Sequence, residues 1–344
     1  MNEVSATPAS RFSSMEDDLH LFALLRSSDD LGLTHQLMQA ASNLTELQTS
    51  LGTNAGTLSQ ILDGLQGFGV IGQRADAYEI NEEWKAYLGS ATRHHQSAGV
   101  RRGLQAVDRW RRLPEIAKDK LQAAEKSAES QMFGSGIHLE QYLLAVRDEN
   151  TEHARTLAHQ LAERLQTSEG RFLDMAGGHG KYAFELLNLC PHAIGTLADL
   201  PQTLAVFERL SAEEPARNRL RAMVCDATRD ELPQQAFDLI LMNDLLHSFD
   251  RQTKVEVLRR VARGLAPGGV LVVSKFGYQD PAKEVENALF SLRLHVNSHG
   301  GYLEKDGEMP GLFEAAGLKI DSVLQLGPKL SYLLSGVTVS QEVH

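Results

Sequence analysis

A glycine-rich turn that directly follows an apolar run constrains this chain more than any other feature. The apolar run covers residues 172–175, and three glycines come next: Gly177, Gly178 and Gly180. Glycine lets the backbone turn sharply and lets a ligand approach it closely. A helix is expected over 181–189, so the turn lies at the carboxyl end of a strand, where open α/β sheets bind their ligands. The segment therefore predicts an α/β sheet with a ligand site at this turn.

Three acidic residues in or after successive apolar runs indicate the kind of ligand. Asp174 stands before the glycines, and its carboxylate can accept a hydrogen bond from an ammonium group. Asp199 follows the apolar run 193–197 and is placed to bind a pair of ribose hydroxyls. Asp226 follows a third apolar run. These carboxylates predict S-adenosylmethionine as the cofactor, because that molecule carries both an ammonium group and a ribose.

The same glycines also allow a dinucleotide interpretation. Residues 178–183 satisfy the G-x-G-x-x-G/A pattern of NAD-binding proteins. That pattern is weak when it stands alone. The carboxylate of Asp174 before the glycines, Asp226 after the third apolar run and the long stretch of chain before the turn favour S-adenosylmethionine over NAD.

The chain divides near residue 165 into a helical part and an α/β part. Beyond that point strands alternate with helices, notably one helix over 253–265 that ends before Pro267-Gly268-Gly269. The expected strands are 171–175, 193–197, 220–225, 237–242, 270–275, 318–325 and 331–339. This order predicts a doubly wound, Rossmann-like sheet. The last two strands follow each other directly, which predicts an antiparallel hairpin at the edge.

Before residue 165 the apolar residues recur at helical spacing, which predicts an all-α unit. Residues 44–88 have the pattern of a winged helix, in which Thr45 caps one helix and Gly52 ends it. A second helix is expected over 57–68, and the wing strands are expected at 70–71 and 78–80 around the turn 74–77. The predicted domains are a winged-helix domain at 12–95, a helical connector and substrate lid at 96–165, and a catalytic domain at 166–344.

Charge excludes the usual partner of a winged helix. Between residues 43 and 88 there are two basic and six acidic residues, and the candidate recognition helix has no Lys or Arg. The whole chain carries 34 Lys and Arg against 45 Asp and Glu, a net charge of −11, so neither nucleic acid nor an anionic membrane is an expected partner.

Cysteine content and apolar runs limit the cellular setting. Cys190 and Cys225 lie inside apolar segments, so no disulfide framework and no thiolate metal site is expected. The sequence has no apolar run near the length of a membrane span and no secretory signal at its beginning. We therefore expect a cytoplasmic protein without a metal.

Taken together, these residues resemble a known family, the S-adenosylmethionine-dependent small-molecule O-methyltransferases of the plant caffeate type and their bacterial antibiotic-pathway relatives. The resemblance covers most of the chain. The matching segments are 173–180 (first motif), Ala198-Asp199-Leu200-Pro201 (ribose motif), Asp226-Ala227 (adenine position), 244–250 (Leu-His-Asp-Trp segment), 266–273 and 300–317.

The resemblance implies a class I methyltransferase fold, an aromatic or heteroaromatic acceptor and a homodimer formed by the N-terminal domain. It also implies that a lid containing Phe133 covers the substrate. The cofactor-binding residues that it implies are Asp174, Gly177, Gly178, Gly180, Asp199, Leu200, Asp226, Ala227 and Asn243.

His247 is the candidate catalytic base. It follows the fourth apolar run, 237–242, at the same end of the sheet as the predicted cofactor site. A phenol must lose its proton on methylation, and imidazole, with an ordinary pKa of about 6.5, is suited to accept it. Arg293 and His295, on one helical face before Gly300-Gly301, line the expected acceptor pocket or form a solvated helix end.

Departures from the family pattern put the chemistry at His247 in question. Ser248 replaces the Asp that normally follows the His, Lys275 replaces a Glu, and Leu303 stands where plant members carry a second acidic residue. Asn243 takes the place of a Lys. A positive Lys275 near His247 would disfavour imidazolium. A heterocyclic nitrogen, or an acidic phenol held as an anion by Lys275, is then an alternative acceptor.

Two other classes of protein remain open. One is an enzyme of the same fold that uses the cofactor for decarboxylation or cyclisation. The other is a non-catalytic dimeric ligand-binding protein. The retained carboxylates Asp174, Asp199 and Asp226 argue against the second class.

Overall fold

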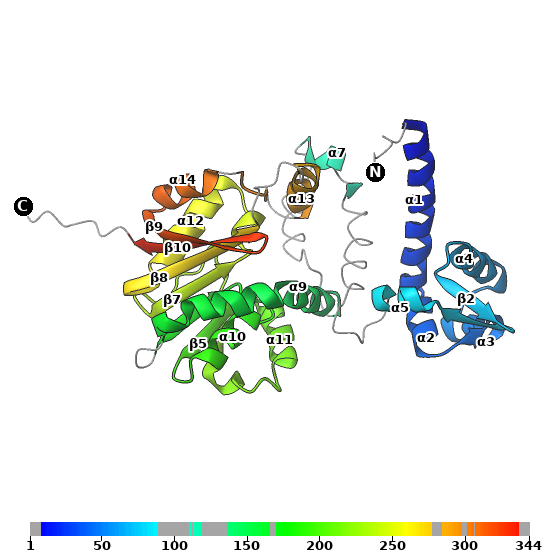
Figure 1. The fold of residues 1–344 in the computed structure, drawn as a ribbon, viewed down its shortest axis with the longest axis horizontal. Helices are drawn as coiled ribbons and strands as arrows, with labels where there is room; N and C mark the ends of the chain where they lie inside the picture. Colours follow the sequence, from blue (N-terminus) through cyan, green and yellow to red (C-terminus); the bar gives the residue numbers. More distant parts are fainter. Residues whose placement is uncertain are drawn as a thin grey trace, which may run out of the picture. The chain divides into compact units, whose positions relative to one another are not determined.

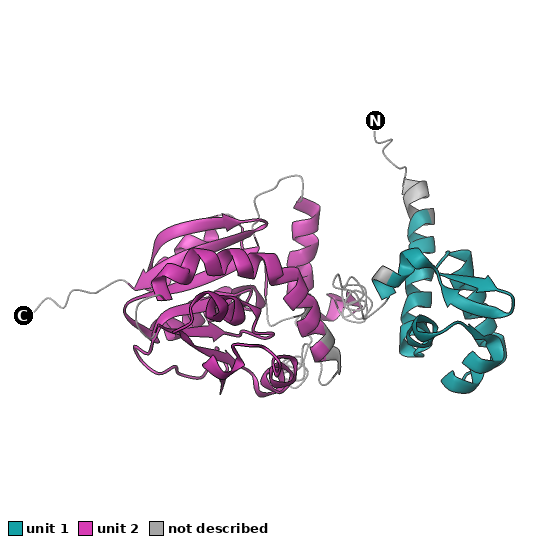
Figure 2. Ribbon diagram, turned by 60° about the horizontal axis from the view of Figure 1, so that its bottom comes forward, with its two compact units in different colours: residues 1–107 teal, residues 108–344 magenta. Residues whose placement is uncertain are grey.

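The computed structural model describes residues 8–88, 110–111, 113–118, 137–165, 170–276, 284–297, 301–305 and 307–336. The chain forms two compact units, residues 1–107 and residues 108–344 (Figure 2). Among the described residues, none of the helices has the length and apolar character needed to cross a membrane.

The N-terminal unit combines helices with a small antiparallel sheet. Its elements are α1 (Pro8–Asp30), α2 (Leu33–Gln39), β1 (Ser42–Asn43), α3 (Leu44–Leu51), α4 (Ala55–Gly67), β2 (Ile71–Arg74), β3 (Ala77–Ile80) and α5 (Glu82–Leu88) (Figure 1). The sheet has the order β1-β3-β2. The unit is mainly helical, as predicted. Strand β1 pairs with β3 and adds to the predicted wing hairpin a strand that the sequence did not indicate.

Local capping explains where the helices of this unit begin. Asn43, not Thr45, caps α3: its side chain accepts from the N–H of Glu46, whose carboxylate accepts from the N–H of Asn43. Gly52 ends α3 in the left-handed region, with φ of 63°, as predicted. The side chain of Asn54 accepts from the N–H of Thr57 and caps α4, which therefore begins two residues earlier than expected. The winged-helix assignment itself stays a prediction.

The larger unit is built on a seven-stranded sheet with the order β6-β5-β4-β7-β8-β10-β9 (Figure 1). Its strands are β4 (Arg171–Met175), β5 (Ile194–Asp199), β6 (Leu220–Val224), β7 (Phe237–Asn243), β8 (Leu265–Phe276), β9 (Leu318–Leu326) and β10 (Lys329–Gly336). The first five are parallel, and β10 runs antiparallel to both of its neighbours. The predicted antiparallel hairpin is confirmed, with β9 at the edge.

Helices connect and cover these strands. The described helices of the larger unit are α7 (Leu113–Ile116), α9 (Ile137–Leu161), α10 (Lys181–Leu189), α11 (Pro201–Leu210), α12 (Arg251–Ala262), α13 (Glu284–Asn297) and α14 (Glu308–Ala315), with 3-10 turns η1 (Ala162–Leu165), η2 (Arg217–Arg219) and η3 (Leu246–Ser248). The bounds of β4 and α10 are those expected from the sequence.

Pro267-Gly268-Gly269 was predicted to separate a helix from the next strand, but these residues lie inside β8. The strand begins at Leu265, and the register between β7 and β8 shifts between Phe237 and Leu239. A Cβ on Gly269 would lie 3.0 Å from the carbonyl oxygen of Phe237. Glycine is needed here because the two strands approach too closely for a side chain. Helix α12 ends at Ala262, three residues before the predicted end.

Alternating side chains give the sheet a core on each face. Phe172, with Leu197 on the next strand, packs with helices α9, α10 and α11, and Leu173 packs on the opposite face with α12 and α14 (Figure 1). Helix α9 falls in the predicted connector, yet its Leu157 and Leu161 are buried in the core of the sheet. Both faces are thus covered, which leaves the carboxyl ends of the parallel strands for a site.

Candidate functional site

The glycine turn joins β4 to α10 in backbone conformations that glycine adopts most readily. Gly178 and Gly180 have φ of 52° and 72°, and Gly180 is the N-cap of α10. A Cβ on Gly180 would lie 2.6 Å from the ring of Phe207, and one on Gly177 would lie 2.8 Å from the carboxyl carbon of Asp174. These two glycines are therefore required for the turn to pack against its neighbours.

Asp199 connects this turn to the end of β5. Its Oδ2 accepts a hydrogen bond of 2.9 Å from the N–H of Gly178, and its Oδ1 accepts one of 2.7 Å from the N–H of Leu200. Burial raises the pKa of Asp199, and these backbone donors oppose that rise. Sequence reasoning assigned Asp199 to a ribose and missed this anchoring role. Each oxygen still has a lone pair with which to accept from a hydroxyl.

Asp174 is a buried carboxylate with one unsatisfied oxygen. It lies in β4 with 1% of its surface exposed, and its Oδ2 has no hydrogen-bond partner among the described residues. Burial, reinforced by the negative charge of Asp199, raises the pKa of Asp174 to about 7, and a hydrogen bond from the backbone N–H of Ala183 opposes the rise. An unpaired buried anion is costly, so a cation that binds here is favoured. The site thus fits the ammonium group predicted from the sequence.

Asp226 shapes the turn that follows β6. Its Oδ1 accepts from both the N–H and the hydroxyl of Thr228, at 2.9 and 2.7 Å, and its Oδ2 lies 3.3 Å from Nε of Arg229. Ala227 beside it is buried. The adenine contact predicted for Asp226 and Ala227 stays a prediction.

Four polar atoms without a hydrogen-bond partner among the described residues lie at the end of β7 and in the loop after it. They are both amide atoms of Asn243, Oδ1 of Asp244 and Nδ1 of His247. A buried polar atom without a partner costs about 1–3 kcal/mol, so such groups are normally paired with protein, water or a ligand. Because β7 lies beside β4 in the sheet, these atoms and Oδ2 of Asp174 end neighbouring strands. This is the strongest indication of a ligand site in the described residues.

His247 is half-buried in the turn η3, with its ring 6.2 Å from that of Phe290 in an edge-to-face contact. Burial lowers its pKa, and the negative charges of Asp244 and Glu304 oppose this. The imidazole is thus neutral at pH 7 and able to accept a proton. Its Nδ1 has no carboxylate partner, as expected where Ser248 replaces an acidic residue.

Lys275 is held by a residue that sequence reasoning overlooked. Its Nζ donates to the backbone carbonyl of Glu304 at 2.8 Å and lies 3.5 Å from Oε2 of the same residue. Oε1 of Glu304 is 2.7 Å from Nζ of Lys254, which is fully buried. Lys275 could hold an acceptor anion only by loosening this cluster. The sequence offered one signal for this ion pair: Glu304 directly follows Leu303, at which the family's plant members carry an acidic residue.

The predicted acceptor residues do not share one helical face. Arg293 and His295 both lie in α13, but residues two apart in an α-helix point in nearly opposite directions. The guanidinium of Arg293 lies 4.7 Å from the centre of the Phe290 ring, whereas His295 is exposed. The prediction of a shared face was wrong, because it overlooked the 3.6-residue period of the helix. Phe133 lies outside the described residues.

A second histidine network, which the sequence did not reveal, lies under the site. His153 of α9 is 2.8 Å from the hydroxyl of Tyr182 through Nδ1 and 3.3 Å from Oγ of Ser331 through Nε2. Ser331 in turn is 2.8 Å from Oγ of Ser274 on the neighbouring strand. Burial and the positive charge of Lys329 lower the pKa of His153 to about 4. This neutral network ties α9 and α10 to β8 and β10.

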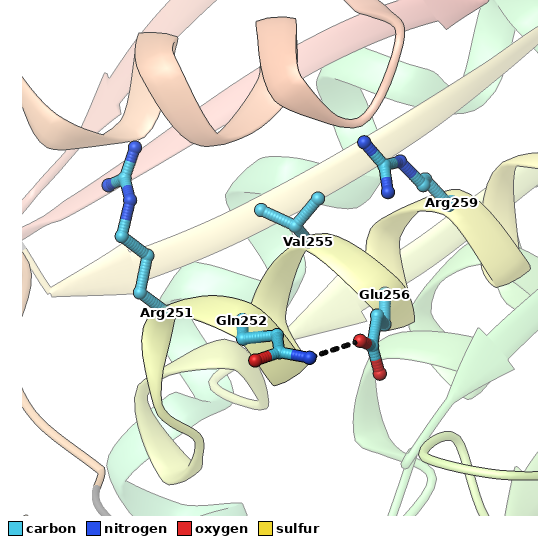
Figure 3. A pocket seen from close by; sticks show the side chains of 5 residues that line it. All are labelled: Arg251, Gln252, Val255, Glu256 and Arg259. Atoms are coloured by element: carbon cyan, nitrogen blue, oxygen red, sulfur yellow. Dashed lines mark hydrogen bonds between the residues drawn. The ribbon is translucent and has the colours of Figure 1, made fainter.

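A surface pocket lies apart from these residues, on helix α12. Figure 3 shows the guanidinium groups of two arginines on either side of Val255 and a hydrogen bond of 2.9 Å between Gln252 and Glu256. The lining residues are Arg251, Gln252, Val255, Glu256 and Arg259. None of the candidate site residues lines it.

Comparison with known proteins places the chain in a family. Residues 115–319, more than half of the sequence, match the family model of the O-methyltransferase domain. The chain therefore belongs to the O-methyltransferase family. The strand order and the glycine turn are those of a class I methyltransferase, so the predicted fold class of the larger unit is confirmed.

Individual relatives differ in how much of the chain they match. The chain is 30% identical over 145 residues to 3-hydroxy-5-methyl-1-naphthoate 3-O-methyltransferase of Streptomyces sahachiroi, which spans 42% of each protein, less than half of that relative's length. It is 24% identical over 306 residues to phenazine O-methyltransferase PhzM of Lysobacter antibioticus, 88% of each. The solved structure of human N-acetylserotonin methyltransferase in complex with SAM superimposes with a TM-score of 0.73 at 17% identity and covers 98% of this chain and 100% of that one, which shows the shared fold.

Proposed function

We propose that this protein is an S-adenosylmethionine-dependent methyltransferase that methylates an oxygen, or a nitrogen, of an aromatic or heteroaromatic small molecule in secondary metabolism. The observation that carries the proposal is the unsatisfied Oδ2 of Asp174 beside a glycine turn that Asp199 anchors. An ammonium group would satisfy the first carboxylate, and ribose hydroxyls would donate to the second.

The places of the other predicted contact residues in the sheet support the proposal. Leu200 and Asp226-Ala227 lie at the ends of β5 and β6, next to the end of β4, and Asn243 offers an amide whose donor and acceptor are both unsatisfied. When bound, S-adenosylmethionine supplies a methyl group that its positive sulfur already activates toward attack. The protein then has to hold the acceptor in line, about 3–3.5 Å from that carbon, and to exclude water.

The acceptor side supports an aromatic substrate. The rings of Phe276 and Phe290 meet edge to face at 5.3 Å, and Phe290 also contacts His247. Such rings suit a flat partner. Two relatives, a naphthoate O-methyltransferase and a phenazine O-methyltransferase, point to the same class of acceptor. A neutral His247 would take the proton of a phenol as the oxygen is methylated.

Nδ1 of His247 has no carboxylate partner among the described residues, and this observation favours a second candidate function that needs no strong base. A nitrogen acceptor, an acidic phenol or a same-fold reaction such as decarboxylation or cyclisation needs no strong base, and one relative is the N,N-dimethyltransferase OxyT of Streptomyces rimosus. A non-catalytic ligand-binding protein is the third candidate.

One pair of measurements separates these candidates. Calorimetry with S-adenosylmethionine tests binding, and incubation with methyl-labelled cofactor and a panel of phenols, aromatic amines and N-heterocycles, read by mass spectrometry, tests transfer. Labelled product supports the methyltransferase. Binding with unlabelled, chemically altered substrate supports the repurposed enzyme, and binding without any change supports a binding protein. Absence of binding would overturn the proposal.

We further propose that the protein is a cytoplasmic homodimer and that its N-terminal domain forms the dimer. The proposed domains are the winged helix at 12–95 and the connector and lid at 96–165. Helix α1 exposes Met15 and Leu19, with 57% and 60% of their surfaces accessible, which supports an interface there. Light scattering at micromolar concentration should find a dimer. A monomer would count against it, and duplex-DNA binding at physiological salt would favour a regulator.

A further inference from the structure

A series of side-chain contacts connects His247 to Lys329 and Asp244. Its imidazole touches Phe290, whose ring meets that of Phe276, and Nζ of Lys329 lies 4.5 Å from the centre of the Phe276 ring. Lys329 forms an ion pair with Asp244, which precedes His247 by three residues in the same loop. The ion pair and the histidine are therefore parts of one structural unit.

Asp244 has an unusual backbone and an incompletely used carboxylate. Its φ is 53°, a left-handed conformation that costs most non-glycine residues energy and that Asp and Asn tolerate better than most. Its N–H donates to the carbonyl of Ser274 at 3.0 Å, which fixes it to β8. Lys329 occupies Oδ2, whereas the buried Oδ1 has no partner. A strained residue with a free buried oxygen suggests a function beyond packing.

Lys329 is itself held in place. It is buried, and its Nζ donates to Oδ1 of Asn150 at 2.6 Å as well as to Asp244. Asn150 belongs to α9, so three elements fix the cation: α9, β10 and the loop after β7. The geometry of Asp244 beside His247 is therefore preset by the fold.

The charged groups around His247 come from several elements. They are Asp244 in its own loop, Lys329 in β10, Lys254 in α12, Glu304 in the segment before α14 and Arg293, stacked on Phe290 in α13. Both lysines oppose protonation of His247, and both carboxylates favour it. Each oxygen of Glu304 lies within ion-pair distance of a lysine, Lys254 or Lys275. Among the described residues, Oδ1 of Asp244 has no such partner and no hydrogen bond.

We propose that Asp244, locked by Lys329, is the positioning residue that sets the proton affinity of His247, in place of the acidic residues lost at Ser248 and Lys275. Its consequence for the rate rests on the proposed methyl transfer. The free carboxylate oxygen favours the imidazolium that forms when an acceptor loses its proton, and the ion pair prevents Asp244 from turning away.

The test is an NMR titration of the full-length apo protein with isotope-labelled histidine. His247→Gln identifies the His247 signal among the 13 histidines. Asp244→Asn removes the charge but keeps a side chain that tolerates the left-handed backbone, and it should lower the pKa of His247 by about half a unit or more. Lys329→Met should raise that pKa, because it removes a positive charge while the backbone N–H of Asp244 stays bound to Ser274. Asp321→Asn, on the exposed edge strand β9, is the matched control and should leave it unchanged.

Each outcome decides the proposal. Equal titration of His247 in Asp244→Asn and Asp321→Asn would overturn it. If His247 stays neutral across pH 4–9 in the wild type, Lys329→Met has to bring its titration into that range, or the proposal is wrong. If Asp244→Asn fails to fold because Lys329 is left unpaired, the double variant Asp244→Asn/Lys329→Met removes both charges and should still lower the pKa. No cofactor or acceptor is needed, so failure of the proposed methyl transfer would show separately in the binding and transfer assays.

Discussion

The cofactor side and the acceptor side of the candidate site hold their carboxylates in different ways. On the cofactor side, backbone N–H groups of a glycine turn bind Asp199, and Asp174 is left unsatisfied. On the acceptor side, lysine side chains bind Glu304 and Asp244. The positions of backbone donors are set by the fold and by a local sequence motif. An ion pair between distant side chains can instead be formed by residues at other positions of the same fold. This difference explains why the first side matches its family pattern and the second departs from it.

The largest effect is expected at Glu304. Burial acts to raise the pKa of Glu304, yet the positive charges of Lys254 and Lys275 hold that pKa below its usual value. Replacing Glu304 with Gln leaves two buried lysines without a counter-charge and should lower the free energy of unfolding by about 3–5 kcal/mol. Denaturant unfolding at pH 7 measures this, with exposed Glu314→Gln in α14 as the control.

The pH dependence of the same pair has a defined sign. Because the folded-state pKa of Glu304 is depressed, its stabilisation is present above the unfolded value of 4.5 and is lost as pH falls through the folded pKa. The difference in the free energy of unfolding between wild type and Glu304→Gln should therefore become smaller as the pH falls. A constant difference from pH 7 to pH 3 would contradict the ion-pair interpretation.

On the cofactor side, Asp199→Ala should weaken S-adenosylmethionine binding by about 30-fold or more. It removes two hydroxyl contacts, worth about 1–3 kcal/mol each, and also frees the N–H of Gly178. Calorimetry measures the affinity. Asp226→Ala is the comparison variant. It should lower the affinity for S-adenosylmethionine less, because Thr228 and Arg229 already bind the carboxylate of Asp226. Unchanged affinity in Asp199→Ala would sink the cofactor assignment.

His247→Ala tests the acceptor side. If His247 is the base, turnover should fall by about 10²-fold or more with cofactor affinity nearly intact. With a nitrogen acceptor, or an anion held by Lys275, the loss should be far smaller and Lys275→Ala should cost more. Rates of both variants across pH 6–9 decide between these outcomes. A wild-type rate independent of pH, with an active His247→Ala enzyme, would leave proximity as the main source of catalysis.

Asp174→Asn should separate stability from binding. The pKa of Asp174 is raised from 3.8 to about 7, so the protein without cofactor loses stability as pH rises from the first value to the second. The variant should equal the wild type near pH 3 and be more stable above pH 7, by on the order of 1–4 kcal/mol. Thermal unfolding at both pH values measures this. Its affinity for S-adenosylmethionine should fall, and a variant that binds normally would remove the ammonium contact.

Local patterns in the sequence were enough for much of the fold. The bounds of β4 and α10, the final hairpin and the end of α3 at Gly52 follow from apolar period and from glycine. The errors occur where a distant partner decides. Strand β1 exists because Ser42 pairs with Tyr78, and Leu265 begins β8 because β7 shifts its register there.

The sequence by itself determined the cofactor side of this protein, because the strand, the glycines and the following carboxylate act within one continuous supersecondary unit. It also placed His247 at the end of β7. Only the tertiary structure decided how the charges around His247 are balanced. Asp244 meets a lysine 85 residues away, and Glu304 meets lysines in α12 and β8. No local period encodes such pairs, because they form only when packing removes both charges from water and leaves each the best partner of the other.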